Sequence, residues 1–219
     1  MAVPALALLF ASSHSGTEWR ARDPRLDPAR VQAVLETLPD DASIVSAIRA
    51  GDDTMLERLF VAHASGLVAF AGTYLKSDDL AWEIVQDVFL WLMTHRGTWT
   101  VPGTVRAYLY SATRHRALNH LKHSAVERRW AEHAKGEMPA RGIPAAGEQA
   151  LISAEQRRAL LNAVSTLAES RRTALALRYG HELSYAEIAN VLGSSVKAVE
   201  NQLNRTLRQL RALLEGAKD

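Results

Sequence analysis

Apolar residues recur at helical spacing through the first half of the chain. Two runs repeat every three to four residues, which is the period of one helix face. They comprise Leu56, Leu59, Phe60, Leu67, Phe70 and Tyr74, then Leu80, Ile84, Val85, Val88 and Leu92. Ser77 precedes Asp78 and Asp79, an order typical of a helix start, because serine caps the first amides and acids favour the helix dipole. We expect a helix to begin there.

A loop and a further helix follow these runs. Residues 97–103 carry two glycines and a proline, which predicts a loop around Trp99. Helical spacing resumes over residues 104–122.

The last third of the chain predicts four more helices, the second ending near Gly180 and the third at Gly193. Their apolar positions are Leu160, Val164 and Leu167; Ala174, Leu175 and Tyr179; Ile188 and Leu192; and Val199, Leu203, Leu207, Leu210 and Leu214. No stretch alternates well enough to predict a strand. The fold class expected is all-α.

Composition divides the chain into two small domains. Residues 131–150 are rich in alanine, glycine, proline and charge, and few of them could enter a core, so we interpret them as a flexible linker. The domains on either side span residues 41–130 and 151–219, and the second contains a helix-turn-helix pattern. Residues 1–40 are interpreted as a flexible or weakly helical N-terminal extension.

Length and composition exclude several classes of protein. The 219 residues contain no cysteine, which rules out a disulfide scaffold, a thiolate zinc site and a cysteine nucleophile. The longest apolar run, residues 5–11, is far short of the ~20 residues of a membrane helix. No lysine or arginine precedes it, so a secretory signal is not indicated. We expect a cytoplasmic protein without membrane insertion.

The net charge of +2 hides an acidic block followed by a basic block. Residues 40–95 contain nine acidic and three basic side chains, a local net charge of −6. Residues 96–130 contain seven basic and one acidic side chain, a local net charge of +6. Chance variation on solvated helix faces is one interpretation. The other is a pair of partners of opposite charge, one of them nucleic acid.

Residues 183–213 have the pattern of a helix-turn-helix. A short helix ends at Gly193, and a second helix opens behind Ser195 as N-cap. Ala189 is small where the two helices approach each other. The alternative is an ordinary helical hairpin with a polar face. The early outward positions of the second helix carry groups that reach base edges or phosphates: Ser195, Val196, Lys197, Glu200, Asn201, Asn204 and Arg205.

Residues 160–211 resemble the promoter-binding domain at the carboxyl end of bacterial sigma factors of the extracytoplasmic-function group. The matching motifs are Leu167-Ala168, Arg172, Ala174-Leu175, Glu187-Ile188-Ala189, Leu192-Gly193, Ser195 and Arg208-Gln209-Leu210-Arg211. Ala168 replaces the family's proline, and Glu200 stands where many members carry lysine. The resemblance implies a duplex interface for the upstream promoter element, made by Arg172, Ser195, Lys197, Glu200, Asn201, Asn204, Arg205 and Arg208.

The segment EIVQDVFLWL, residues 83–92, resembles the helix with which this family docks on the clamp of the largest RNA polymerase subunit. The resemblance places Glu83, Gln86 and Asp87 on the docking face, with Trp91 at its edge. Carboxylates on one helix face suit a basic partner. The alternative is that these acids only solvate a surface helix.

The next helix resembles the family's promoter-melting helix, with several departures. Tyr108-Leu109 stands for Trp-Leu and Arg114-His115 for Arg-Asn. In the family, the preceding loop, here residues 96–103, pockets a base flipped from the DNA. Unpaired DNA needs cationic groups and planar side chains for stacking. The implied set is Arg96, Trp99, Tyr108, Arg114, His115, Asn119 and Lys122. Trp99 is equally compatible with a core anchor for the loop.

The two resemblances, in this order, predict a sigma factor: a non-enzymatic subunit without cofactor that directs core RNA polymerase, through its clamp and flap, to promoter DNA. An anti-sigma factor is a further candidate partner. Three other classes of protein fit the sequence less well. An enzyme lacks a recognisable motif, and His115, His120 and His123 are poorly spaced for a metal. A response regulator with a similar helix-turn-helix would need strands before it. An interaction module such as an anti-sigma-like helical bundle would lack the third, basic block, residues 150–219, with its net charge of +3.

Overall fold

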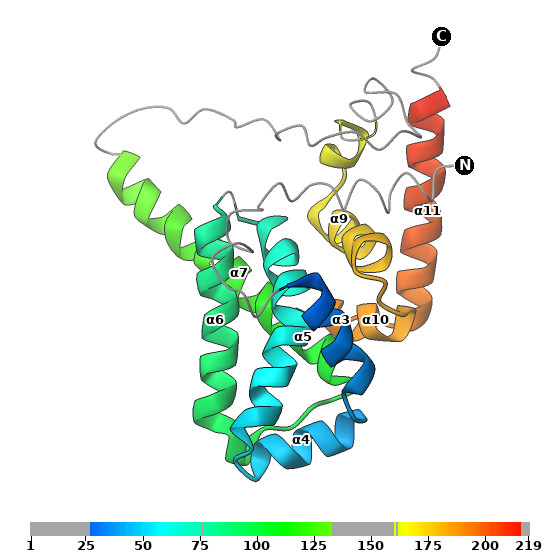
Figure 1. Ribbon diagram of the computed structural model, residues 1–219. Helices are drawn as coiled ribbons and strands as arrows, with labels where there is room; N and C mark the ends of the chain where they lie inside the picture. Colours follow the sequence, from blue (N-terminus) through cyan, green and yellow to red (C-terminus); the bar gives the residue numbers. More distant parts are fainter. Residues whose placement is uncertain (1–26, 76, 133–159, 161, 216–219) are drawn as a thin grey trace. The chain divides into compact units, whose positions relative to one another are not determined.

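The computed structural model describes residues 27–75, 77–132, 160 and 162–215. These residues form two compact units, 27–132 and 160–215, and each is described by itself. Both are helical, and no strand occurs in the described ranges, so the all-α prediction is confirmed (Figure 1).

The first unit is built around a long central helix. Its elements are α3 (Pro28–Thr37), α4 (Asp41–Arg49), α5 (Asp53–Gly72), α6 (Asp78–His95), the 3-10 turn η2 (Arg96–Thr98) and α7 (Val105–Glu132). Helix α5 contacts α3, α4, α6 and α7. Figure 1 shows α6 running along α5, with α4 across one end of α5. Leu59, Leu67 and Phe70 of α5 are fully buried at this centre.

Aromatic pairs connect α5 to its two long neighbours. Phe60 meets Phe89 of α6 edge to face at 5.0 Å, and Phe70 meets Tyr110 of α7 at 5.2 Å. Such pairs add about 0.5–1.5 kcal/mol each beyond the area that they bury. By length and composition α5 is the one described helix that could cross a membrane, but half of its apolar window is buried among the other helices, as in a core helix.

Capping residues fix the starts of α5 and α6, and the start of α6 is the one that the sequence predicts. The Leu80 amide donates to Ser77 Oγ at 3.3 Å, so the predicted start of α6 is confirmed. Asp52 caps α5 by accepting from the Met55 amide at 3.0 Å. Helix α7, however, continues ten residues beyond the predicted end at Lys122 and reaches Glu132.

Residues 28–37 of the predicted extension form helix α3 and belong to the first unit. Asp27 caps α3 by accepting from the Ala29 amide at 2.9 Å, and Pro28 suits the first helical turn. Arg30 pairs with Glu57 of α5 at 3.6 Å, and Arg58 of α5 donates to the Thr37 carbonyl. The first unit therefore begins well before residue 41. Residues 1–26, and most of the predicted linker, lie outside the described residues.

The second unit contains α9 (Glu169–Leu175), the π-helical turn η3 (Ala176–Gly180), α10 (Tyr185–Leu192) and α11 (Val196–Glu215). Residues 162–165 are also helical. Leu175, Leu177, Leu183, Ile188 and Val199 are fully buried and form its core. The π turn is a departure from the continuous helix predicted up to Gly180.

The half-buried His63 of α5 predicts an acid-sensitive first unit. Desolvation, together with the nearby Arg106 charge, lowers the pKa of His63 to about 4. Below pH 6.5 the unfolded chain therefore takes up a proton that the folded domain does not, and stability falls until about pH 4. The loss from this group is about 1.4 kcal/mol at pH 5.5. In urea melts at pH 7 and 5.5, His63→Gln should remove that part of the loss. The control, exposed His123→Gln, should retain it; an unchanged pH dependence in His63→Gln would contradict the assignment.

Candidate nucleic-acid and polymerase interfaces

The helix-turn-helix is held by local capping bonds. Ser184 Oγ accepts from the Glu187 amide at 3.2 Å, and the Glu187 carboxylate accepts from the Ser184 amide at 2.8 Å, which is a reciprocal capping box. Gly193 ends α10 in the left-handed conformation, with φ 62°. Ser195 Oγ then accepts from the Ala198 amide at 3.2 Å and opens α11. The predicted end of α10 at Gly193 and the predicted N-cap Ser195 are confirmed, whereas the capping box at Ser184 was not predicted.

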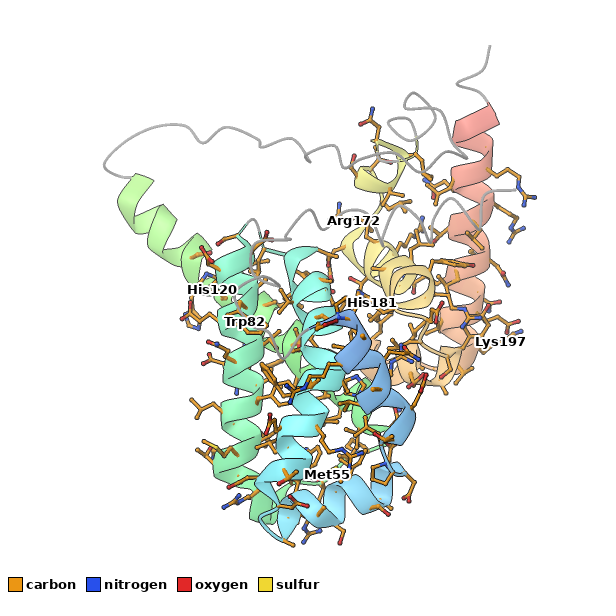
Figure 2. The ribbon with its side chains drawn as sticks, viewed as in Figure 1. Met55, Trp82, His120, Arg172, His181 and Lys197 are labelled. Carbon is orange, nitrogen blue, oxygen red and sulfur yellow. The ribbon has the colours of Figure 1, made fainter. Side chains whose placement is uncertain are left out.

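Helix α11 separates a buried face from an exposed polar face. Val199, Leu203 and Leu210 are buried, whereas Lys197 points away from its domain (Figure 2). Within the exposed face, Lys197 Nζ pairs with the Glu200 carboxylate at 2.9 Å. Glu200 is half-buried, and the other predicted members are exposed: Ser195, Lys197, Asn201, Asn204, Arg205 and Arg208.

Arginines outside α11 hold the second unit together. Arg171 of α9 donates to Gln209 of α11 at 3.0 Å, and Arg178 donates to the Leu183 carbonyl at 3.0 Å. The Arg172 side chain, predicted to face DNA, is exposed on α9, where its Nη1 donates to the Ser165 carbonyl at 3.0 Å (Figure 2). The structure therefore puts Arg172 on a different helix from the other predicted duplex contacts.

Loss of the α10 cap should destabilise the second unit without touching the exposed face of α11. Ser184→Ala removes the acceptor of the Glu187 amide and should cost about 1 kcal/mol. Thermal unfolding monitored by circular dichroism measures this loss. Ser194→Ala, at an exposed turn residue, is the matched control. A Ser184→Ala variant as stable as this control would show that the capping box contributes nothing.

Helix α6 exposes a face that is both acidic and apolar. Glu83, Gln86 and Asp87 are exposed as expected, and Trp91 is 37% exposed and stacks on His95 at 4.6 Å. Leu90 and Met93 are also exposed, at 53% and 45%, although the sequence did not predict them as contact residues. The available signal was the unbroken apolar run from Val88 to Met93, which is wider than one buried helix stripe.

A groove of about 460 Å³ lies between α6 and α7. It brings Trp91, predicted for the polymerase, together with Tyr108, His115 and Asn119, predicted for DNA. Asn119 Nδ2 and His115 Nε2 lie 2.9 Å apart, in hydrogen-bonding distance. Burial raises the pKa of Tyr108. The remaining lining residues are Val88, Ser111, Ala112 and Arg116.

The cations of α7 are arranged differently from the prediction. Lys122 is exposed, and by helical geometry it shares the face of Tyr108 and His115. Arg114 lies about 120° from Tyr108 around the helix and does not line the groove. Arg116, which was not among the predicted DNA contacts, does line the groove and reaches Asp87 of α6 at 4.0 Å. The described residues include no group of three or more histidine, aspartate or glutamate side chains arranged to hold a metal.

Trp99 is a core residue. Its side chain is 1% exposed and meets Tyr108 edge to face at 5.6 Å. Because almost none of the Trp99 ring is exposed, a base cannot stack on it, and the structure favours the core-anchor interpretation. The Trp99 indole packs against the Tyr108 ring, which lines the groove.

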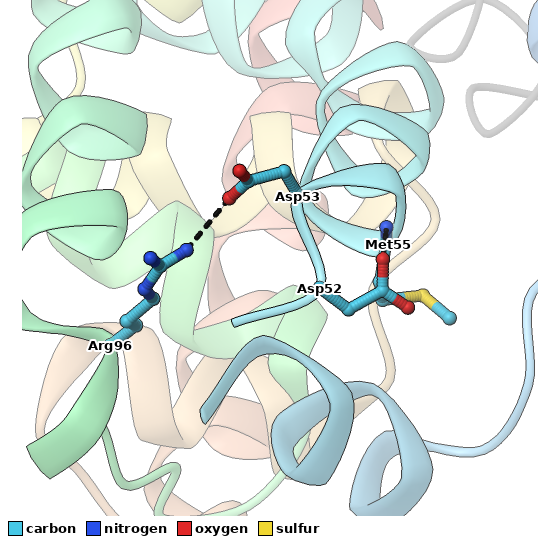
Figure 3. Close-up of polar contacts among 4 residues, drawn as sticks. All are labelled: Asp52, Asp53, Met55 and Arg96. Atoms are coloured by element: carbon cyan, nitrogen blue, oxygen red, sulfur yellow. Dashed lines mark hydrogen bonds and ion pairs between the residues drawn. The ribbon is translucent and has the colours of Figure 1, made fainter. Parts of the chain in front are cut away.

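Arg96, predicted to contact DNA, forms an ion pair within the first unit. Its Nη1 donates to Asp53 Oδ1 at 2.7 Å, as Figure 3 shows. The pair joins the carboxyl end of α6 to the amino end of α5. Arg96 is therefore engaged with protein in this structure, unlike the exposed Lys122.

A second pocket, of about 500 Å³, lies against the loop that was predicted to hold a flipped base. Val101 and Gly103 of this loop form one wall. The other wall is the first part of α4 and its last turn, lined by Asp41, Ala42, Val45, Ser46 and Arg49. None of the α4 residues was selected from the sequence, because their proximity to the loop arises only from packing.

Comparisons with known proteins match both units. Residues 59–126 match the family Sigma-70 region 2, and residues 157–210 match Sigma-70, region 4. The ECF RNA polymerase sigma factor BldN of Streptomyces coelicolor is 27% identical over 173 residues, 78% of this chain and 64% of BldN. The sigma factor CarQ of Myxococcus xanthus is 28% identical over 167 residues, 76% of this chain and 92% of CarQ.

Solved structures share the fold. The structure of CnrH in complex with the cytosolic domain of CnrY matches with a TM-score of 0.55 and 21% identity, over 80% of this chain and 97% of CnrH. The sigma factor RpoE of Bartonella quintana, in complex with the anti-sigma factor NepR, matches with a TM-score of 0.50 and 19% identity, over 80% and 93%. A response regulator is not favoured, because its helix-turn-helix would not follow a region 2 domain. Because region 2 and region 4 match in this order, and relatives named as RNA polymerase sigma factors match most of this chain, the chain belongs to the sigma-70 family of RNA polymerase sigma factors, in its extracytoplasmic-function group.

Proposed function

We propose that the chain binds core RNA polymerase and directs it to promoters, where its first unit melts the downstream element and its second unit binds the upstream element. The observation that carries this proposal is the α6–α7 pair. Helix α6 offers an exposed acidic and apolar face, and the groove between α6 and α7 offers cationic and planar groups. These are the surfaces needed for a protein partner and for unpaired DNA.

The α6 face is proposed as the polymerase contact. Its acids Glu83 and Asp87 suit a basic partner surface, and Leu90, Trp91 and Met93 supply apolar area next to them. An exposed apolar cluster rimmed by polar groups is typical of a protein-binding site. We add Leu90 and Met93 to the predicted docking residues for this reason.

The α6–α7 groove and the loop pocket are proposed as the two sites for unpaired DNA. Tyr108 supplies a ring, His115 and Asn119 supply hydrogen-bonding groups, and Arg116 and Lys122 supply positive charge. The pocket between the loop and α4 has room for a flipped base, and Asp41, Ser46 and Arg49 offer both donors and acceptors to its edge. These sites replace the buried Trp99 as the proposed place of base capture.

The exposed face of α11 is proposed to bind the upstream duplex in the major groove. Asn201, Asn204 and Arg205 lie on this face, and amide and guanidinium groups pair with base edges there. An anti-sigma factor is proposed as the regulatory partner, on the ground that the RpoE structure that shares this fold contains one. The exposed α6 face would be open to it as well.

Selection of promoters by the assembled enzyme tests the proposed function. The chain is mixed with core polymerase from the same bacterium, and duplexes are selected from a randomised pool and sequenced. We expect a stable complex in gel filtration and an enriched two-part sequence motif from which run-off transcription starts. Absence of a complex at micromolar concentration, or transcription that does not depend on this chain, would contradict the proposal.

A further inference from the structure

The loop between α6 and α7 holds several parts of the proposed DNA sites in place. Trp99 lies within it and packs against Tyr108, which lines the groove. Val101 and Gly103 form a wall of the pocket against α4. A shift of this loop would therefore alter both sites together. The first residue of the loop is Arg96.

Two neighbouring aspartates at the start of α5 have different partners (Figure 3). Asp52 caps the helix by accepting from the Met55 amide at 3.0 Å. The cap leaves the Asp53 carboxylate available, and it pairs with Arg96 at 2.7 Å. Asp53 is well exposed and lies in the first turn of α5, where its charge also favours the helix dipole, so the carboxylate has a helix-stabilising role besides this contact.

The turn before α5 is shaped to receive the Arg96 side chain. Gly51 has φ 93°, a conformation that favours glycine. A Cβ atom at Gly51 would lie 3.7 Å from the guanidinium carbon of Arg96, so the guanidinium rests against this turn. The turn η2, which begins at Arg96, also packs against α4. Arg96 thus contacts the α4–α5 turn and Asp53 at the base of the loop.

We propose that Arg96 is a positioning residue: through its ion pair with Asp53 it fixes the loop of residues 96–104, and with it the Tyr108 groove and the α4 pocket, for promoter melting. The predicted effect on promoter melting rests on the proposed function, whereas the effect on the loop does not. It replaces direct DNA contact as the role of Arg96. The ion pair is partly exposed, and coupling of this kind changes an equilibrium by about two- to fivefold.

Hydrogen exchange of the full chain without polymerase or DNA tests the structural half. Arg96→Ala and Asp53→Asn should each speed amide exchange in residues 97–104 by about two- to fivefold, and the double variant should be no faster than Arg96→Ala. Asp52→Asn is the matched control: it makes the same charge change one residue away, and asparagine still caps the helix. Unchanged exchange in Arg96→Ala or in Asp53→Asn would overturn the proposal.

Open-complex formation tests the functional half. The probe is a duplex selected by the wild-type holoenzyme, used fully paired and with its downstream element pre-melted. Arg96→Ala and Asp53→Asn should slow opening of the paired duplex by the same two- to fivefold, non-additively, without changing the salt dependence of binding. Arg96→Lys, which retains the charge pair, should restore most of the rate.

The outcomes separate the two proposals. A salt slope that falls by about one unit in Arg96→Ala, with Asp53→Asn like wild type, would make Arg96 a phosphate contact and overturn the positioning role. If the wild-type chain opens no duplex at all, the proposed function fails, and the exchange measurement still decides whether Arg96 and Asp53 hold the loop.

Discussion

Reversal of Glu83 and Asp87 to lysine should weaken binding to core polymerase by a hundredfold or more. Both side chains are exposed on the α6 face. Hydrogen bonds to charged groups are worth about 1.5–3 kcal/mol each, so the loss of two accounts for about 3 kcal/mol, before any repulsion from the new lysines. The 4.0 Å contact of Asp87 with Arg116 is partly exposed, and its loss should barely affect folding.

Titration of the fluorescently labelled chain with core polymerase measures this affinity, and circular dichroism checks that helical content is retained. Asp78→Lys is the control, because it reverses one charge at the start of the same helix but away from the proposed contact. Equal affinity of the double variant and wild type would move the polymerase contact to another surface. An equally large loss of affinity in Asp78→Lys would show that the effect comes from the overall charge of the chain and not from a contact of Glu83 and Asp87.

Replacement of Tyr108 and Asn119 by alanine should lower promoter opening tenfold or more while binding to the upstream duplex persists. Both residues line the α6–α7 groove, and stacking of a base on an aromatic ring is worth about 1–3 kcal/mol. Permanganate footprinting of the holoenzyme on a selected duplex measures the opening. Tyr108→Phe is the control, because it retains the ring and the contact with Trp99.

Substitutions on α11 should produce the reverse pattern. Asn201→Ala and Glu200→Ala should relax sequence preference at the upstream element, since a base-edge contact discriminates by about 1–3 kcal/mol, and should leave transcription from a pre-melted template unchanged.

A Tyr108→Ala/Asn119→Ala variant that melts the paired duplex as wild type does would show that the groove is not a DNA site. Loss of duplex binding in that variant would place Tyr108 and Asn119 in docking instead.

Most of the helices could be read from the sequence, because their causes are local. Periodic apolar residues require only that one face be buried, and Ser77 and Ser195 bond to amides three residues ahead. Gly193 ends α10 because its own backbone reaches the left-handed conformation. The family resemblance likewise rested on contiguous motifs, and the matches to regions 2 and 4 confirm it.

The faces of those helices, and the partners of their polar groups, were decided by packing. Helical periodicity already places Leu92 on the buried stripe of α6, but only the positions of the neighbouring helices leave Leu90, Trp91 and Met93 together as an exposed apolar cluster. Trp99 is covered by its fold, and Arg96 meets Asp53 from 43 positions away in the sequence. Helical periodicity and capping relate residues three or four positions apart, whereas burial and ion pairing depend on distances in space. For this chain the first determined which segments are helices, and the second determined which side chains remain available to polymerase and DNA.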